Sequence, residues 1–234
     1  IIKLMDTGQF VSTCTTEALV RAAHALKSGS LVAFPTETVY GLGANASDIH
    51  AVKRIYEVKG RPTDHPLIVH IASMQGIDDW VINIPDFAIS LGRAFWPGPM
   101  TLILNRSALA PDFITGGQDT VGVRVPNHPI ALALLNEFEK IGGKGVAAPS
   151  ANRFGHVSPT TAEAVNNELA KFLSHDDLIL DGGPSQVGVE STIIDCTSDI
   201  PKILRPGAIT EEMITEITNL PLGQSTGEIR VSGS

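Results

Sequence analysis

Residues 31–43 read LVAFPTETVYGLG, an apolar run that stops at a proline and passes into polar and glycine-rich sequence. The continuous apolar run before Pro35 predicts a buried β-strand. Residues 41–46 match the G-x-G-x-x-A form of a dinucleotide fingerprint, but residues 36–40 separate the first glycine from the strand. We therefore interpret residues 41–46 as a loop that needs small residues and positive φ.

Strand and helix signals alternate on both sides of this segment. We expect strands at residues 31–34, 67–71, 100–104, 120–125, 145–148, 178–180, 191–195 and 202–204. We expect helices that begin near Thr15, Ser47, Pro85, Pro129, Ser158 and Thr210. The alternation predicts one α/β domain over residues 1–220, followed by a polar, linker-like tail over residues 221–234.

The composition narrows the class of protein. The chain has 234 residues, of which 43% are hydrophobic, and its 17 Lys and Arg residues against 25 Asp and Glu residues give a net charge of −8. That much apolar material excludes a disordered chain, and no apolar run reaches the roughly 18 residues that cross a bilayer, so we expect no membrane association. The acidic balance argues against a surface that binds nucleic acid throughout.

The common metal and nucleotide motifs are missing from the sequence. It contains neither a G-x-x-x-x-G-K-[ST] loop nor an H-E-x-x-H pair, and we predict no metal site held by the protein. Cys14 and Cys196 are too few for a disulfide scaffold or a cysteine zinc site. We therefore expect a reduced, cytoplasmic compartment.

Four segments place polar residues at predicted strand ends or in loops, namely residues 35–43, 59–66, 120–124 and 149–152. Each also has a purely structural interpretation. Lys59 and Arg61 could be a solvated helix end. Arg124 could face water between two valines, and Ser150 and Asn152 could be turn residues. Taken singly, these alternatives stay open.

Together the segments resemble the YrdC/Sua5 family of threonylcarbamoyl-AMP synthases. Residues 59–61, K-G-R, match the K-x-R element of the family, and residues 150–152, S-A-N, match its S-x-N element. The same pattern fits, in order, residues 35–43, 66–70, 96–101, 122–126 and 204–207. The resemblance covers roughly residues 16–215, and it implies an α/β fold in which a twisted mixed sheet, flanked by helices, surrounds a deep cleft.

The resemblance also implies a reaction. Family members are similar in converting L-threonine, bicarbonate and ATP, with Mg²⁺ on the phosphates, into L-threonylcarbamoyladenylate and pyrophosphate. Partner proteins receive the adenylate and use it for the t6A modification of tRNA. A threonine carbamate attacks the α-phosphate of ATP in this chemistry, so the protein mainly has to hold anions together and exclude water.

Site residues are implied by their positions in the matching motifs. The implied catalytic set is Lys59, Arg61, Ser150 and Asn152. The implied ATP contacts are Arg61, His65, Thr120, Ser150, Ser158 and Arg205. The implied threonine contacts are Thr38, His70, Arg124, Ala148 and Ser191. Arg124 suits the amino-acid carboxylate, because a guanidinium can form paired hydrogen bonds with one.

Two features depart from the family pattern. His65 stands where the family often has Asn, and an imidazole can replace an amide as a hydrogen-bond donor. Sua5-type members continue through a linker, which folds over the site, into a second domain that is absent after residues 221–234. We expect a truncated Sua5-type protein, and a short YrdC-type form with a tail is the alternative.

Two other functions remain open. A YrdC-like module of hydrogenase-maturation carbamoyltransferases would use the same adenylation chemistry, but the zinc fingers and additional domains of those proteins are absent from this sequence. The main alternative is an RNA-binding translation factor without synthase activity. Lys53, Arg54, Lys59 and Arg61 against Glu57 give a local charge of +3, which suits a nucleotide and supports only weak RNA binding.

Overall fold

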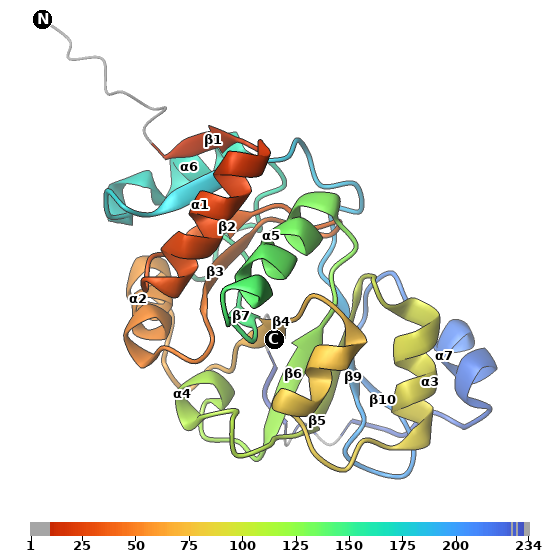
Figure 1. Cartoon of the computed structure of the whole chain (residues 1–234). Coiled ribbons are helices and arrows are strands. Elements are labelled where there is room, and N and C mark those ends of the chain that lie inside the picture. The colour runs from red at the N-terminus through yellow and green to blue at the C-terminus, as the bar shows by residue number, and fades with distance from the viewer. Residues whose placement is uncertain (1–9, 226, 228, 232–234) are drawn as a thin grey trace, which may run out of the picture.

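A ten-stranded mixed sheet organises the fold (Figure 1). The computed structural model describes residues 10–225, 227 and 229–231. The strand order is β1-β8-β2-β3-β7-β4-β6-β5-β9-β10, with both parallel and antiparallel neighbours. The strands are β1 (Val11–Thr13), β2 (Val32–Phe34), β3 (Gly41–Asn45), β4 (Ile68–His70), β5 (Met100–Asn105), β6 (Thr120–Arg124), β7 (Val146–Ala147), β8 (Leu178–Asp181), β9 (Thr192–Asp195) and β10 (Lys202–Arg205). This mixed sheet with flanking helices confirms the expected fold class.

Helices pack against the sheet on both of its faces. They are α1 (Thr16–Lys27), α2 (Ile49–Lys59), α3 (Asp86–Phe95), α4 (Asp112–Thr115), α5 (Pro129–Lys140), α6 (Ala162–Leu169), α7 (Glu211–Thr218) and the 3₁₀ turns η1 (Met74–Asp79) and η2 (Ala170–Phe172). Successive residues of a strand point to opposite faces. Val32 and Phe34 therefore pack in one apolar cluster with α1 and α5, whereas Ala33 packs in another with α2. Over the described part of the chain, no helix combines the length and the apolar character that a membrane span requires.

Side-chain caps confirm three of the expected helix starts. Thr15, Asp48 and Thr210 each accept a hydrogen bond from a backbone N–H in the first turn of the helix that follows. The predicted start at Ser158 is wrong, because α6 begins only at Ala162. Its N-cap is Thr161, whose extended backbone lets the hydroxyl accept from the N–H of Ala164.

The segment after β2 differs from its expected structure. Residues Gly41–Asn45 form strand β3, which is antiparallel to β2 and β7, and neither Gly41 nor Gly43 has positive φ. The prediction of a loop with positive φ is therefore wrong. A Cβ atom at Gly43 would lie 2.7 Å from Val146 Cγ1 and 2.8 Å from Phe34 Cε1. Small residues are needed here because side chains of the neighbouring strands cover the backbone.

Four short elements have no corresponding prediction, namely β1, α4, η1 and η2. Each contains between three and six residues, which is too few to show a hydrophobic period. β1 is an edge strand that pairs in parallel with β8, with Val11 opposite Ile179. Its place in the sheet thus depends on a partner that lies far away along the chain.

Candidate functional site

Strand pairing brings the predicted site segments together. Parallel strands β4 and β6 place His70 opposite Arg124 at their carboxyl ends. An isolated bridge joins Gly41 to Ser150, so the segment after β2 meets the S-x-N loop. Parallel strands β5 and β9 bring the hydroxyl of Thr101 within 2.8 Å of the hydroxyl just before β9, on Ser191. Polar groups from distant parts of the sequence therefore converge at one place on the sheet.

The five residues predicted to contact threonine line a single pocket. They are Thr38, His70, Arg124, Ala148 and Ser191. Thr36, Ser150 and Glu190 also line it. The enclosed space is about 20 Å³, slightly more than the roughly 10–15 Å³ that a single water requires. The pocket is thus small and built from the ends of several strands, and the apolar residues Val39, Ile68 and Pro149 line it beside the polar groups.

Arg124 is buried, with 4% of its surface exposed, so the interpretation that it faces water is wrong. Its strand lies between β4 and β5, inside the sheet. The guanidinium Nη2 donates to Glu37 Oε1 at 2.6 Å and to Thr38 Oγ1 at 3.0 Å. Among the described residues, Arg124 Nε is buried and has no hydrogen-bond partner.

Glu37 is a buried site residue that the sequence did not single out. It lies between β2 and β3, and its second oxygen, Oε2, accepts from the backbone N–H of Asn127 at 3.0 Å. A carboxylate in a polar segment usually faces water. The available signal was its position, two residues after the buried strand expected at residues 31–34 and its terminal proline.

His70 is a neutral imidazole at ordinary pH. Burial, reinforced by the positive charge of Arg124, lowers the pKa of His70 to about 3. Its Nδ1 lies 3.3 Å from the carbonyl oxygen of Ile68. His70 can therefore exchange hydrogen bonds in the pocket without adding a second positive charge beside Arg124.

Lys59 of the K-x-R element and Asn152 of the S-x-N element are joined through the main chain of the S-x-N loop. Lys59 is 2% exposed, and its Nζ donates to the carbonyl oxygens of Ser150 and Asn152, at 2.5 Å each. The solvated-helix-end interpretation is thus wrong for this lysine. Burial, with the nearby charge of Arg61, lowers the pKa of Lys59 to about 7. Asn152 Nδ2 donates to the carbonyl oxygen of His156 at 2.6 Å, which closes the loop on its other side.

Arg61 and His65 meet at one aromatic ring, that of Phe154. The Arg61 guanidinium carbon lies 5.8 Å from the ring centroid, and the His65 ring packs edge-on with a centroid distance of 5.3 Å. Arg61 is 8% exposed and donates to the carbonyl oxygen of Pro66 at 3.2 Å. Burial lowers the pKa of Arg61 from its usual value. Two of the predicted ATP contacts thus pack against the same ring, which is 43% exposed.

Arg205 and Ser158 adjoin the pocket through Glu190. Ser158 Oγ donates to Glu190 Oε1 at 2.7 Å, and Arg205 Nη2 lies 3.5 Å from Glu190 Oε2. Arg205 Nη2 also donates to the carbonyl oxygen of Ser191 at 2.9 Å. Burial lowers the pKa of Arg205. Two further predicted ATP contacts therefore lie beside the predicted threonine contacts.

Thr120 lies apart from the other predicted ATP contacts. It lines a second pocket, of about 10 Å³, with Pro66 and the tail residues Arg230 and Val231. The tail is held there by Gln118, whose amide accepts from the N–H of Arg230 at 2.8 Å and donates to its carbonyl at 3.0 Å. Residues 226, 228 and 232–234 of the predicted tail lie outside the described residues.

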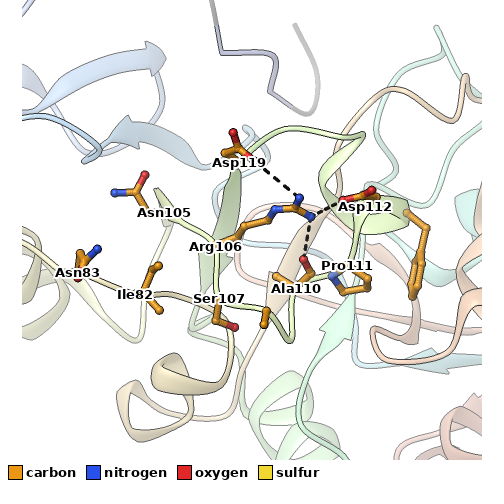
Figure 2. Close-up of a pocket in the computed structure, with 11 residues that line it drawn as sticks. Ile82, Asn83, Asn105, Arg106, Ser107, Ala110, Pro111, Asp112 and Asp119 are labelled. Atoms are coloured by element: carbon orange, nitrogen blue, oxygen red, sulfur yellow. Dashed lines mark hydrogen bonds and ion pairs between the residues drawn. The ribbon is translucent and has the colours of Figure 1, made fainter.

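A much larger cavity, about 790 Å³, opens at the opposite end of β5 and β6. Figure 2 shows its lining, with the Arg106 guanidinium directed at Asp112, Asp119 and the carbonyl of Ala110. None of the predicted site residues belongs to this lining. Across the described residues, no three His, Cys, Asp or Glu side chains gather in a way that could hold a metal ion.

A family model described as telomere recombination, for Sua5, YciO and YrdC sequences, matches residues 24–207. The chain is 50% identical over 201 residues to the threonylcarbamoyl-AMP synthase of Bacillus subtilis, which covers 85% of this chain and 56% of that protein. It is 39% identical over 199 residues to a putative threonylcarbamoyl-AMP synthase of Mycobacterium tuberculosis, covering 85% of this chain and 88% of that protein.

A solved structure shows the same fold with a ligand. The crystal structure of P. abyssi Sua5 complexed with L-threonine superposes with a TM-score of 0.86 at 44% sequence identity. The match covers 96% of this chain and 66% of that one. The chain therefore spans between about half and two thirds of the length of the first relatives that it matches.

Proposed function

The chain belongs to the Sua5/YciO/YrdC family, and from this premise we propose that it forms L-threonylcarbamoyladenylate and pyrophosphate from L-threonine, bicarbonate and MgATP. Such an enzyme is a nucleotidyltransferase. The observation that carries the proposal is the convergence of Thr38, His70, Arg124, Ala148 and Ser191, from five segments of the chain, on one pocket.

The reaction asks little covalent chemistry of the protein. The threonine amine condenses with bicarbonate, with loss of water, to give a carbamate. A carbamate oxygen attacks the α-phosphorus of ATP, and pyrophosphate leaves with the electron pair of the broken P–O bond. The protein's contribution is to position two anions, the carbamate and ATP, and to stabilise charge on the phosphates.

The side chains that line the pocket suit the chemical groups of the amino-acid substrate. Arg124 can bind the carboxylate through Nε, which is buried without a partner in the described structure. The hydroxyls of Thr38 and Ser191 can pair with the substrate hydroxyl. An analogue that lacks this hydroxyl would leave buried polar groups unpaired, which is how such a site rejects an isostere.

Cations beside the pocket suit the triphosphate. Arg61 and Arg205 carry guanidinium groups, and Ser150 and Ser158 carry hydroxyls, which are groups that suit phosphate oxygens. Arg205 donates to the carbonyl of Ser191 and Ser158 donates to Glu190, so ATP would replace these acceptors on binding. Lys59 adds charge beside the S-x-N loop that it holds. In this proposal His65 and Thr120 are ATP contacts as well, and Mg²⁺ arrives on ATP, held by phosphate and water oxygens.

The adenylate is labile, so we propose that it passes to cytoplasmic partner proteins that make the t6A modification of tRNA. The alternative, an RNA-binding factor without synthase activity, is not favoured. Of its four basic residues, Arg54 is paired with Asp177, and Lys59 and Arg61 are buried. Little of the predicted +3 charge is therefore presented to an RNA backbone, and weak RNA binding would show as a shallow salt dependence.

Incorporation of radiolabelled bicarbonate tests the proposal. The chain with MgATP and L-threonine is expected to form a labelled adenylate, and L-valine, which lacks the hydroxyl, is expected to give much less. Arg61→Ala is the matched control, since it removes a phosphate contact outside the threonine pocket. A folded chain that forms no labelled product, or forms it equally with valine, would refute the proposal for this chain.

A further inference from the structure

Glu37 uses both of its carboxylate oxygens inside the site. Oε1 accepts from Arg124 Nη2 at 2.6 Å, and Oε2 accepts from the backbone N–H of Asn127 at 3.0 Å. The side chains of Glu37 and Arg124 are 7% and 5% exposed. The carboxylate thus bridges the end of β6 to the chain that follows it, with almost no access for water.

The bridge fixes one end of the guanidinium and leaves another part of it unused. Nη2 is held twice, by Glu37 Oε1 and by Thr38 Oγ1. In the described structure Nε is buried without an acceptor. Leaving a buried donor unpaired costs about 1–3 kcal/mol, so this N–H has a strong preference for a ligand oxygen. A carboxylate is a suitable ligand, because one of its oxygens can accept a charge-assisted hydrogen bond from Nε.

We propose that Glu37 is a positioning residue, which orients Arg124 for the carboxylate of the amino-acid substrate. The inference rests on the proposed function and adds a residue to it. Glu37 does not contact the substrate in this role. It holds Nη2 in place, and with it the orientation of the guanidinium of Arg124, a residue that lines the pocket.

Position and charge predict opposite effects when Glu37 is neutralised. If Glu37 were merely a counter-charge, its loss would leave Arg124 buried and unpaired, and Arg124 would bind a carboxylate more tightly. If Glu37 positions Arg124, its loss releases the guanidinium, and binding weakens. Glu37→Gln separates the two roles, because one end of the amide must then face a donor, either Arg124 Nη2 or the N–H of Asn127.

The test is calorimetric binding of L-threonine to the whole chain and to its Glu37→Gln and Glu37→Asp variants. We expect both variants to bind threonine about 10- to 100-fold more weakly, because a displacement of about 1 Å at a bound group has effects of that size. Glu37→Asp keeps the negative charge but moves it back by the length of one methylene. Weaker threonine binding in both variants therefore supports a positioning role for Glu37. Tighter or unchanged binding in Glu37→Gln overturns the inference.

Two further ligands separate this role from a loss of folding. L-Threoninol lacks the carboxylate and is expected to bind more weakly than threonine. Its affinity is expected to be the same for wild type and for Glu37→Gln. Affinity for a non-hydrolysable ATP analogue is also expected to stay unchanged. A Glu37→Gln effect of equal size on threoninol or on the nucleotide would overturn the inference. A wild-type chain that binds no threonine would instead refute the proposed function itself, and this inference with it.

Discussion

Two arginine–carboxylate pairs stand at opposite ends of the antiparallel strands β5 and β6, and their distances are almost equal. Arg124, the last residue of β6, lies 2.6 Å from Glu37, and Arg106, directly after β5, lies 2.5 Å from Asp112. The side chains of the first pair are 5% and 7% exposed, whereas those of the second are 24% and 78% exposed. Water screens the second pair, and the first depends on its protein partners. Burial distinguishes the two pairs, and distance does not.

The size of the surrounding cavity does not show which pair belongs to a ligand site. The exposed pair lines the cavity of about 790 Å³ in Figure 2, and the buried pair lines a pocket of about 20 Å³. Arg106 has its nitrogens engaged by two carboxylates and a carbonyl. Arg124, in the described structure, keeps a buried Nε without an acceptor. An unmet hydrogen bond points to a ligand more directly than an empty volume does.

Removing the buried arginine is expected to have the largest effect. In Arg124→Met the threonine affinity should fall by about 30-fold or more, since truncating one partner of a buried charge pair costs about 2–5 kcal/mol. The free energy of unfolding should also fall, by about 3–5 kcal/mol, because Glu37 is left as an unpaired buried charge. Calorimetric binding and thermal unfolding measure the two effects.

The double variant Arg124→Met/Glu37→Gln is the control for that experiment. It removes the unpaired charge, so most of the lost stability should return while threonine binding stays weak. Threonine affinity within a few-fold of wild type in either variant would contradict the role assigned to Arg124.

A second buried carboxylate tests whether burial alone makes a site. Asp177 has a fully buried side chain and accepts from Arg54, from Leu31 N at 2.7 Å and from Ser174 N at 2.7 Å. Asp177→Asn should lower the free energy of unfolding by about 2–3 kcal/mol, since an amide cannot accept from all of these donors. Threonine affinity should stay the same, because Asp177 does not line the pocket. Weaker threonine binding in a folded variant would show that burial and function are not separable here.

Lys59 provides a buried cation whose charge changes with pH. Its pKa of about 7 lies below the usual value because of burial, so its positive charge is present below pH 7 and is lost above it. Affinity for a non-hydrolysable ATP analogue should therefore fall about 10-fold from about pH 6 to about pH 9, the size expected for one charge-assisted hydrogen bond. Isothermal titration at several pH values measures this.

Lys59→Met is the matched control for the pH series. Its affinity should be low and nearly independent of pH, so the difference from wild type should shrink as pH rises. An identical pH profile in wild type and variant would assign the dependence to another group.

The exposed pair should give the smallest effect. Asp112→Asn is expected to change the free energy of unfolding by about 0.5 kcal/mol or less, because exposed pairs of this kind contribute little and salt screens them. Threonine and nucleotide affinities should not change. A loss of either affinity would make the cavity in Figure 2 part of the functional site.

The sequence predicts the long elements of this fold because their signals are local. Helix α1 carries its apolar spacing and its cap, Thr15, within a few residues. The structure of residues 41–46 is not predicted in this way, since the space beside Gly43 is filled by Val146, about a hundred residues further along the chain. No local pattern reports such a neighbour.

The site likewise has a part that the sequence predicts and a part that it does not. Resemblance supplies the positions of Arg124 and His70, and the structure places them on the pocket. The resemblance does not predict the hydrogen bonds from Lys59 to the carbonyls of Ser150 and Asn152, nor the hydrogen bond that Glu37 accepts from the N–H of Asn127. Both depend on which distant backbone groups lie within reach. Motif spacing records residue types, whereas these contacts depend on the backbone path.

The two glycines of β3 determine which sequence changes this site can tolerate. A methyl group at Gly41 would meet Ala148 Cβ at 3.4 Å and Phe34 Cζ at 3.6 Å, both ordinary contacts, whereas at Gly43 it would overlap its neighbours. Alanine should therefore survive at position 41 and be lost at position 43 in a saturation library scored for folded protein. Gly41 also lines the pocket. A single substitution at position 41 can therefore make the pocket smaller. Position 43, in contrast, has to stay glycine for the neighbouring strands to pack.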